Sequence, residues 1–280
     1  MTDLTQKVVF FDIDGTLTHD HQPVEKQTCQ AIEQLKVRGV LPVLATGRPP
    51  VMLKEVSEQV GIENFISMNG QYIYLNGAPL YKNPLPFDVV SDLLDFARES
   101  GHQAMIFNAD EILGGRLYQL ATSKFAQKVG RVLGKWAPRP SQNIFFKLAF
   151  KNQFDKEMLA NEDIYQVVLQ VSPEEEQPYI EKFGDRLGFT RSSEYVMDVI
   201  GRHMNKAQGV QRVVDHLGVD LENTYAFGDN INDLEMLKYV GHGIAMADGA
   251  AEAQAVADFI TPSSKVDGIA HGLRHFELIE

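Results

Sequence analysis

Cysteine is almost absent from this chain, which has a single one, Cys29, in 280 residues. No disulfide can therefore form within the chain, and this favours a reducing, cytoplasmic setting. No apolar run approaches the length that spans a membrane, and the start, Met-Thr-Asp-Leu-Thr, lacks the basic region and apolar core of a signal peptide. These absences predict a cytoplasmic protein with no membrane partner.

Positive charge is also scarce. The chain has 26 Lys and Arg against 38 Asp and Glu, a formal net charge of -12. This balance argues against a nucleic-acid-binding surface. It leaves phosphorylated small molecules open as substrates, because a bound divalent cation can reverse the local field. Hydrophobic residues at 44% and a length of 280 residues suit one large globular domain or two ordinary ones.

The most informative stretch runs from Val8 to Leu17 and reads Val-Val-Phe-Phe-Asp-Ile-Asp-Gly-Thr-Leu. Its apolar, β-branched and aromatic start is typical of a strand buried on both faces of a parallel sheet. Asp12 and Asp14 follow at the carboxyl end, where open α/β sheets bind ligands, and their spacing predicts that both carboxylates face one pocket. Two neighbouring carboxylates need a cation or a shared proton. A solvated Asp-x-Asp-Gly turn is the alternative.

A second strand, Val40 to Ala45, runs into Thr46-Gly47-Arg48 and then Pro49-Pro50. We expect a helix carrying the apolar residues Val51, Met52, Val56 and Val60 to begin directly afterwards. The Thr46 hydroxyl and free backbone N–H groups can then hold a phosphate with help from the helix dipole. A plain helix N-cap is the alternative role for Thr46.

Two further stretches carry polar groups at helix starts. Lys206 opens a helix with apolar residues at helical spacing, and a cation is disfavoured there unless an anion lies nearby. A short strand at 224–227 releases Gly228-Asp229-Asn230-Ile231-Asn232-Asp233 into another helix. Two carboxylates and two carboxamides at one strand-to-helix junction indicate a binding site, although Asn232 or Asp233 can instead cap the helix.

The order of the elements predicts an α/β fold with a doubly wound, mostly parallel sheet. We expect residues 1–82 and 201–280 to form this core, including a hairpin about Asn76-Gly77 and a closing helix from Val266 to Phe276. Residues 83–200 mix helices and strands differently, with expected strands at 117–121 and 144–150 and a helix at 124–136. This middle third is expected to be an inserted α+β domain.

Taken together, these motifs resemble the haloacid dehalogenase superfamily, and within it the Cof-type phosphatases with a class IIB cap. The resemblance covers essentially the whole chain. The matching residues are Asp12-x-Asp14-Gly15-Thr16, Ala45-Thr46-Gly47-Arg48, Lys206 and Gly228-Asp229-Asn230-x-Asn232-Asp233.

The resemblance implies a role for each matching residue. Asp12 is the expected nucleophile, which forms an aspartyl-phosphate, and Asp14 is the expected general acid and base. Mg²⁺ is the implied cofactor, an ion that prefers oxygen ligands. Its expected ligands are Asp12, Asp14 through its backbone carbonyl, and Asp229. The expected phosphate-binding residues are Ile13, Thr46, Gly47, Lys206 and Asn232. Asp233 and Arg48 are expected to contact these residues rather than the ion or the substrate, and Asp233 is expected to orient Lys206 or Asp229.

The sequence therefore predicts a Mg²⁺-dependent phosphatase for a small phosphorylated metabolite, a sugar phosphate or a phosphorylated cofactor. A phosphomutase of the phosphomannomutase kind and a non-catalytic phospho-ligand sensor are the alternatives. The inserted domain is the expected cap, and its polar loop carries Asn108, Glu111, Arg116 and Tyr118 as candidate substrate contacts, with a solvated loop as the alternative. A monomer or small homo-oligomer is expected.

Overall fold

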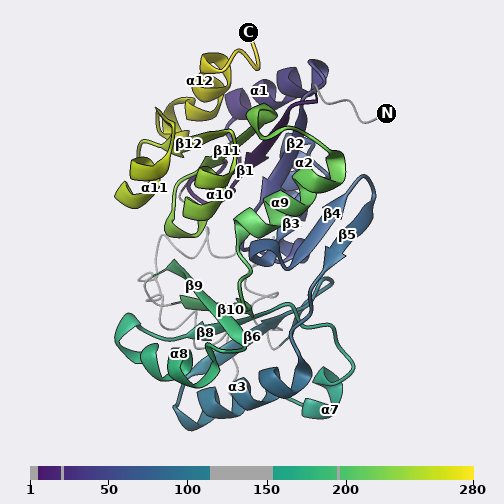
Figure 1. Ribbon diagram of the computed structural model, residues 1–280, viewed down its shortest axis with the longest axis vertical. Helices are drawn as coiled ribbons and strands as arrows, with labels where there is room; N and C mark the ends of the chain where they lie inside the picture. The colour runs from purple at the N-terminus through teal and green to yellow at the C-terminus, as the bar shows by residue number, and fades with distance from the viewer. Residues whose placement is uncertain (1–5, 20–21, 114–153, 194–195) are drawn as a thin grey trace, which may run out of the picture. The chain divides into compact units, whose positions relative to one another are not determined.

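The computed structural model describes residues 6–19, 22–113, 154–193 and 196–280 (Figure 1). The chain divides into two compact units, Met1–Asn83 with His203–Glu280, and Pro84–Arg202. The first unit is thus built from both ends of the sequence, and the second is inserted between them.

The first unit is an eight-stranded sheet with helices on both faces. Its strands are β1 (Val8–Phe11), β2 (Leu41–Ala45), β3 (Phe65–Ser67), β4 (Tyr72–Leu75), β5 (Ala78–Lys82), β11 (Thr224–Gly228), β12 (His242–Met246) and β13 (Phe259–Thr261). Its α-helices are α1 (Lys26–Val37), α2 (Lys54–Val60), α9 (Lys206–Leu217), α10 (Leu234–Tyr239), α11 (Ala251–Val256) and α12 (Gly268–His275).

The strand order is β13-β12-β11-β1-β2-β3-β4-β5. The first six strands run parallel, and β4 and β5 add an antiparallel hairpin at one edge. Asn76 and Gly77, at the tip of the hairpin, have φ of +53° and +83°, as the favoured two-residue hairpin turn requires. The predicted doubly wound, mostly parallel sheet is confirmed.

Strand β1 lies in the middle of the sheet, between β11 and β2, and its four residues are completely buried. Val9 and Phe11 join an apolar cluster with α1, α2 and α12, while Val8 and Phe10 join a second cluster with α9, α10 and α11. Alternate side chains of one strand thus hold helices on opposite faces of the sheet. Figure 1 shows α9 and α10 covering the face toward the viewer.

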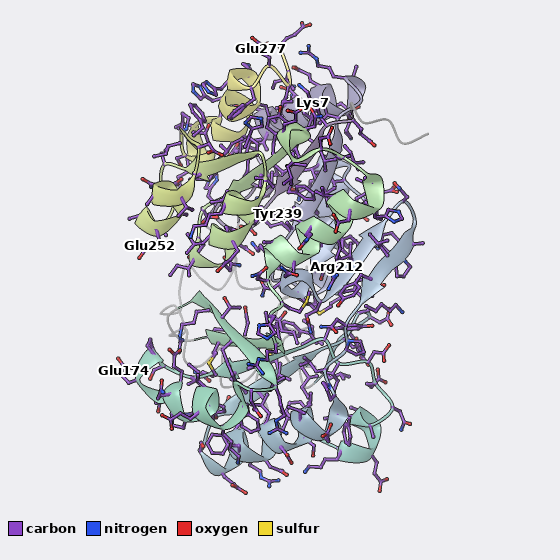
Figure 2. The ribbon with its side chains drawn as sticks, viewed as in Figure 1. Lys7, Glu174, Arg212, Tyr239, Glu252 and Glu277 are labelled. Carbon is purple, nitrogen blue, oxygen red and sulfur yellow. The ribbon has the colours of Figure 1, made fainter. Side chains whose placement is uncertain are left out.

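Helix α9 also reaches the antiparallel edge of the sheet. The guanidinium carbon of Arg212 on α9 (Figure 2) lies 4.1 Å from the centroid of the Tyr81 ring on β5, a cation–π contact. At the other end of α9, the Asn205 side chain accepts a hydrogen bond of 2.9 Å from the Gln208 N–H and caps the helix. These contacts fix where Lys206, the first residue of α9, begins.

Two helices of this unit begin later than the sequence predicts. Pro49 is extended and is followed by a 3₁₀ turn, Pro50–Met52, so α2 starts only at Lys54. The helix expected from Val266 starts at Gly268, because the preceding Asp267 takes a left-handed φ of +64°. In both places the local backbone, rather than the apolar spacing, decides the start.

The second unit is a five-stranded antiparallel sheet of order β7-β6-β8-β10-β9. Its elements are α3 (Phe87–Glu99), β6 (Gln103–Phe107), β7 (Ile112–Leu113), α7 (Lys156–Leu159), β8 (Gln166–Gln170), α8 (Gln177–Phe183), β9 (Leu187–Ser193) and β10 (Val196–Gly201). Apolar residues of α3 and α8 pack on one face of the sheet. The elements expected at 117–121, 124–136 and 144–150 lie outside the described residues.

Candidate active site

Asp12 follows β1 at its carboxyl end, and its neighbour β11 brings Asp229 to the same edge. Phe11 pairs with Phe227 in the parallel register, and the Asp12 N–H donates to the Phe227 carbonyl at 3.0 Å. Asp12 and Asp229 therefore extend from adjacent strands, each just beyond the last paired residue. The chain brings together two carboxylates that are more than two hundred positions apart.

Gly15 and Thr16 fit closely around Asp229. The φ of Gly15 is +91°, and a Cβ on this residue would lie 2.1 Å from Oδ2 of Asp229. Only glycine therefore suits this position, for both its backbone and its neighbour. The fully buried Thr16 hydroxyl donates a hydrogen bond of 2.8 Å to Oδ1 of Asp229. The glycine turn after β1 thus positions Asp229 as well as Asp14.

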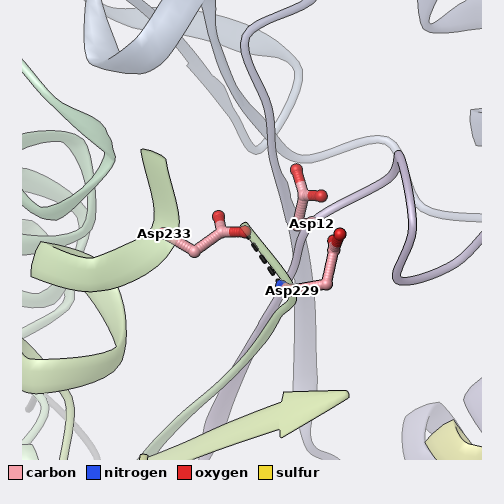
Figure 3. Close-up of side chains that lie close together, drawn as sticks. All are labelled: Asp12, Asp229 and Asp233. Atoms are coloured by element: carbon pink, nitrogen blue, oxygen red, sulfur yellow. Dashed lines mark hydrogen bonds between the residues drawn. The ribbon is translucent and has the colours of Figure 1, made fainter. Parts of the chain in front are cut away.

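Asp12, Asp229 and Asp233 form a cluster of three carboxylates, shown in Figure 3. Each offers an oxygen atom, and these three atoms lie within 4.8 Å of one another. Among the described residues this is the group of acidic, histidine or cysteine side chains that could hold a metal ion. Carboxylate oxygens are ligands that Mg²⁺ prefers.

Lys206 is the buried cation of the site. Its ammonium lies 2.5 Å from Oδ1 of Asp12 and 2.7 Å from Oδ1 of Asp233, and its side chain is 0% exposed. The anion expected near the start of α9 is therefore present as two carboxylates. They also explain how a lysine can be buried at a helix start, where the dipole and desolvation both disfavour its charge.

Asp233 contacts the site in two ways. One carboxylate oxygen pairs with Lys206, and the other accepts hydrogen bonds from the backbone N–H groups of Asp229 at 3.0 Å and Asn230 at 3.1 Å. Together with Asn230 it also forms a capping box around the 3₁₀ turn Ile231–Asp233. The capping role and the site role are thus filled by the same carboxylate. Asn232, the candidate phosphate ligand, is half-buried on this turn.

The cluster carries more negative than positive charge. Burial raises the pKa of Asp12 well above its ordinary value, and Lys206 only partly opposes this. Burial and the charge of Asp233 raise the pKa of Asp229 to about 6. Burial alone would lower the pKa of Lys206, but Asp12 and Asp233 raise it. A divalent cation held by these carboxylates would offset the repulsion between them that helps to raise the pKa values of Asp12 and Asp229, and carboxylate oxygens are suitable donors for one.

The carboxylate of Asp14 lies outside this cluster. Its side chain is 54% exposed, and both of its oxygens accept hydrogen bonds from Arg48. The distance from Nε of Arg48 to Oδ2 of Asp14 is 2.8 Å. Ile13, between the two aspartates, is buried, and its carbonyl accepts from the N–H and hydroxyl of Thr18. Asp12 and Asp14 therefore have different surroundings despite their spacing.

Thr46 and Gly47 follow β2 at the same edge of the sheet. Thr46 is buried, and its hydroxyl accepts a hydrogen bond of 3.1 Å from the Arg48 N–H. Because α2 begins only at Lys54, Thr46 is not a helix N-cap, and the expectation that a helix dipole assists at Thr46 is wrong. The two prolines separate the strand end from the helix. The hydroxyl and the backbone of this loop remain as possible phosphate contacts.

Sequence reasoning missed Asn69. It follows β3, the next parallel strand, is 1% exposed, and donates its N–H to the Thr46 carbonyl at 3.1 Å. Both polar atoms of its carboxamide are buried without a hydrogen-bond partner among the described residues. A Cβ on Gly47 would lie 3.2 Å from its Nδ2, so Gly47 lets Asn69 approach the loop. Its position after a parallel strand was the signal available in the sequence.

Asn108, a candidate substrate contact in the polar loop of the second unit, stabilises that loop. Oδ1 of Asn108 accepts from the backbone N–H groups of Asp110 and Glu111, and its Nδ2 donates to Glu162 at 2.9 Å. Asn108 thus holds its own turn. Arg116 and Tyr118 lie outside the described residues.

Within the described ranges, every helix is too short or too polar to span a lipid bilayer.

Nearly the whole chain is similar to a family of hydrolases and to individual proteins of known sequence. The family model described as haloacid dehalogenase-like hydrolase matches residues 9–273. The Bacillus subtilis (strain 168) protein YkrA, a phosphatase by name, is 30% identical over 277 residues, which are 99% of this chain and 100% of YkrA. The 5-amino-6-(5-phospho-D-ribitylamino)uracil phosphatase YcsE of the same organism is 28% identical over 276 residues, 99% of this chain and 98% of YcsE.

A solved structure of a phosphatase is similar to this chain over the same length. The subclass IIB sugar phosphatase BT4131 superimposes with a TM-score of 0.76 at 25% sequence identity, and the match covers 98% of this chain and 100% of that one. The similarity extends over both units. The cluster of Asp12, Asp229 and Asp233 therefore lies in a chain that is similar, over nearly its whole length, to YcsE and BT4131, two proteins named as phosphatases.

Proposed function

Since the chain belongs to the haloacid dehalogenase-like hydrolase family and is a Cof-type phosphomonoesterase, we propose that it is a Mg²⁺-dependent phosphatase for a small phosphorylated metabolite. The substrate is a sugar phosphate or a phosphorylated cofactor, and hydrolysis passes through an aspartyl-phosphate. The observation that carries the proposal is the contact of Lys206 with Asp12 inside the cluster of three carboxylates.

In this proposal Asp12 is the nucleophile. One of its carboxylate oxygens attacks phosphorus, the bond from phosphorus to the ester oxygen breaks, and Asp14 gives a proton to the leaving alkoxide. Asp14 then takes a proton from water, the resulting hydroxide attacks phosphorus, and the bond to Asp12 breaks to release inorganic phosphate. Atoms and charge balance over the two steps.

The other residues hold the phosphoryl group and the ion. Asp12, the Asp14 carbonyl and Asp229 would hold Mg²⁺, which when bound offsets the repulsion between an anionic nucleophile and an anionic phosphate. The proposed phosphate contacts are Ile13, Thr46, Gly47, Lys206 and Asn232. Asp233 supports two of these groups, because it contacts both Lys206 and the backbone of Asp229.

The second unit, residues 84–202, is in this proposal the cap that selects the substrate. Two relatives support a small phosphorylated metabolite: BT4131 is named a sugar phosphatase, and YcsE is named for a phosphorylated ribitylaminouracil. We propose a cytoplasmic location, which the single cysteine supports, and a monomer or small homo-oligomer.

A panel of phosphorylated metabolites, assayed with Mg²⁺ and with a chelator, tests this function. Asp12→Asn serves as the blank, because it keeps the shape of the side chain and removes the nucleophile. Phosphate release that survives both chelation and this substitution would overturn the mechanism. Isomerised product that depends on an added sugar bisphosphate would instead identify a phosphomutase, and binding without turnover would identify a sensor.

A further inference from the structure

Arg48 and Asp14 form a two-pronged ion pair at the carboxyl edge of the sheet. Nε of Arg48 donates to one oxygen of Asp14 at 2.8 Å, and Nη2 donates to the other. The guanidinium side chain is 21% exposed and the carboxylate 54% exposed, so solvent and ligands can reach both. Such forks are the strongest geometry for an arginine–carboxylate pair.

The backbone of Arg48 is held on both sides. Its N–H donates to the Thr46 hydroxyl at 3.1 Å, and its carbonyl accepts from the Ser67 hydroxyl at 2.7 Å and from the Met68 N–H at 3.2 Å. Any change of partner must therefore come from the side chain. The same contacts keep Arg48 next to Thr46 and Gly47, the residues proposed to bind phosphate.

The fork conflicts with the task proposed for Asp14. A carboxylate whose two oxygens both accept from a guanidinium has about half of its lone-pair sites occupied and its orientation fixed toward Arg48, which hinders proton exchange with the leaving oxygen or with water. A phosphoryl dianion also offers two oxygens to the guanidinium fork, and it carries more negative charge than a carboxylate. An incoming phosphate therefore competes directly for Arg48.

We propose that Arg48 exchanges partners: it pairs with Asp14 in the free enzyme and with an oxygen of the phosphoryl group when phosphate is bound. Arg48 is then a substrate contact, and Asp14 is released for proton transfer only in an enzyme that holds a phosphate. This inference rests on the proposed phosphatase function, whose phosphate-binding loop it extends by one residue.

Inorganic phosphate, the product, is the probe, and its dissociation constant is measured by calorimetry in saturating Mg²⁺. Four proteins complete a double-mutant cycle: the unchanged protein, Asp14→Asn, Arg48→Ala and both changes together. If Arg48 exchanges partners, Asp14→Asn removes a competitor for Arg48 and so tightens phosphate binding. When residue 48 is alanine there is no such competition, so we expect the tightening by Asp14→Asn to be about fivefold larger with Arg48 than with alanine. Arg48→Lys, which keeps the charge but not the fork, replaces Arg48→Ala if the alanine variant does not fold.

Asp267→Asn is the control for the loss of a carboxylate that pairs with an arginine, because Asp267 contacts Arg274 at 3.4 Å. It removes one negative charge from the same unit and is expected to leave phosphate affinity within twofold. Equal tightening by Asp14→Asn in both Arg48 backgrounds, or weaker binding with Arg48 present, would overturn the exchange and leave the phosphatase intact. A protein that binds no phosphate in Mg²⁺ would overturn the phosphatase itself.

Discussion

The ammonium of Lys206 lies 2.5 Å from Oδ1 of Asp12, although the two residues are 194 positions apart in the chain. Asp12 follows the first strand, and Lys206 opens the helix that resumes the first unit after the insertion. Glycines make the approach possible: a Cβ on Gly209 would lie 2.4 Å from Ile66, and one on Gly70 would lie 2.6 Å from the Asn205 carbonyl. The position of this one ammonium thus depends on close packing of α9 and the residue before it against β3 and the segment after it.

We predict that Lys206→Ala lowers both activity and stability. It leaves Asp12 and Asp233 buried without their cation, which costs about 3–5 kcal/mol of unfolding free energy, and it removes a charge that stabilises the transition state. We expect kcat/KM to fall at least about a hundredfold. Lys238→Ala, on exposed helix surface of α10, is the control and should match the unchanged protein in denaturant unfolding and in phosphate release. Wild-type turnover by Lys206→Ala would contradict the proposed site.

Stability of the metal-free protein is expected to fall as the pH rises from 3.8 through about 6. The pKa of Asp229 is raised from its ordinary 3.8 to about 6, so the folded protein binds a proton in this window that the unfolded chain has already released. The slope of unfolding free energy with pH is therefore negative there. Thermal unfolding in chelator at several pH values measures it.

Mg²⁺ is expected to reverse this trend, because the ion competes with the proton on Asp229 and binds better above pH 6. The gain in Tm on adding Mg²⁺ should therefore grow with pH. Asp229→Asn should flatten both dependences. An Asp229→Asn variant with the same pH dependence as the unchanged metal-free protein would contradict the charge assignment of the cluster.

Gly15→Ala is predicted to abolish metal-dependent activity and to destabilise the fold. The new Cβ would lie 2.1 Å from Oδ2 of Asp229, and the left-handed φ of +91° adds about 1–3 kcal/mol of strain. Gly77→Ala is the matched control: its φ is +83°, but no atom lies within 4 Å of the added Cβ. It should show the strain in its Tm and keep its activity. Equal activity losses in the two variants would contradict a specific role for the Gly15 contact.

Thr16→Val should weaken Mg²⁺ binding while preserving the shape of the side chain. It removes the 2.8 Å hydrogen bond that orients Asp229, and losses of such supporting contacts typically cost 10- to 100-fold in metal affinity, which we take as about the range here. Titration of Tm with Mg²⁺ measures the affinity without an activity assay. Thr224→Val, equally buried but at the opposite end of β11, should lower stability without changing Mg²⁺ affinity. Unchanged affinity in Thr16→Val would show that Asp229 needs no such support.

Several features of the fold follow from residues that are neighbours in the chain. The apolar run Val8–Phe11 predicts a buried strand, and Asn76-Gly77 predicts the hairpin turn, because both depend on local side-chain and backbone preferences. Local preference fails at Pro49-Pro50, where apolar spacing predicted an earlier helix and the prolines impose an extended residue and a 3₁₀ turn first.

By itself, the sequence determined the strand ends that carry polar groups, and hence that Asp12, Thr46 and Asp229 share one edge of a parallel sheet. The tertiary structure alone decided the partners: Lys206 with Asp12 and Asp233, Thr16 with Asp229, and Arg48 with Asp14. The reason is that the direction of a strand is a property of a few consecutive residues. The pairing of side chains depends on where two distant backbones come to rest, and a register shift of one residue changes it.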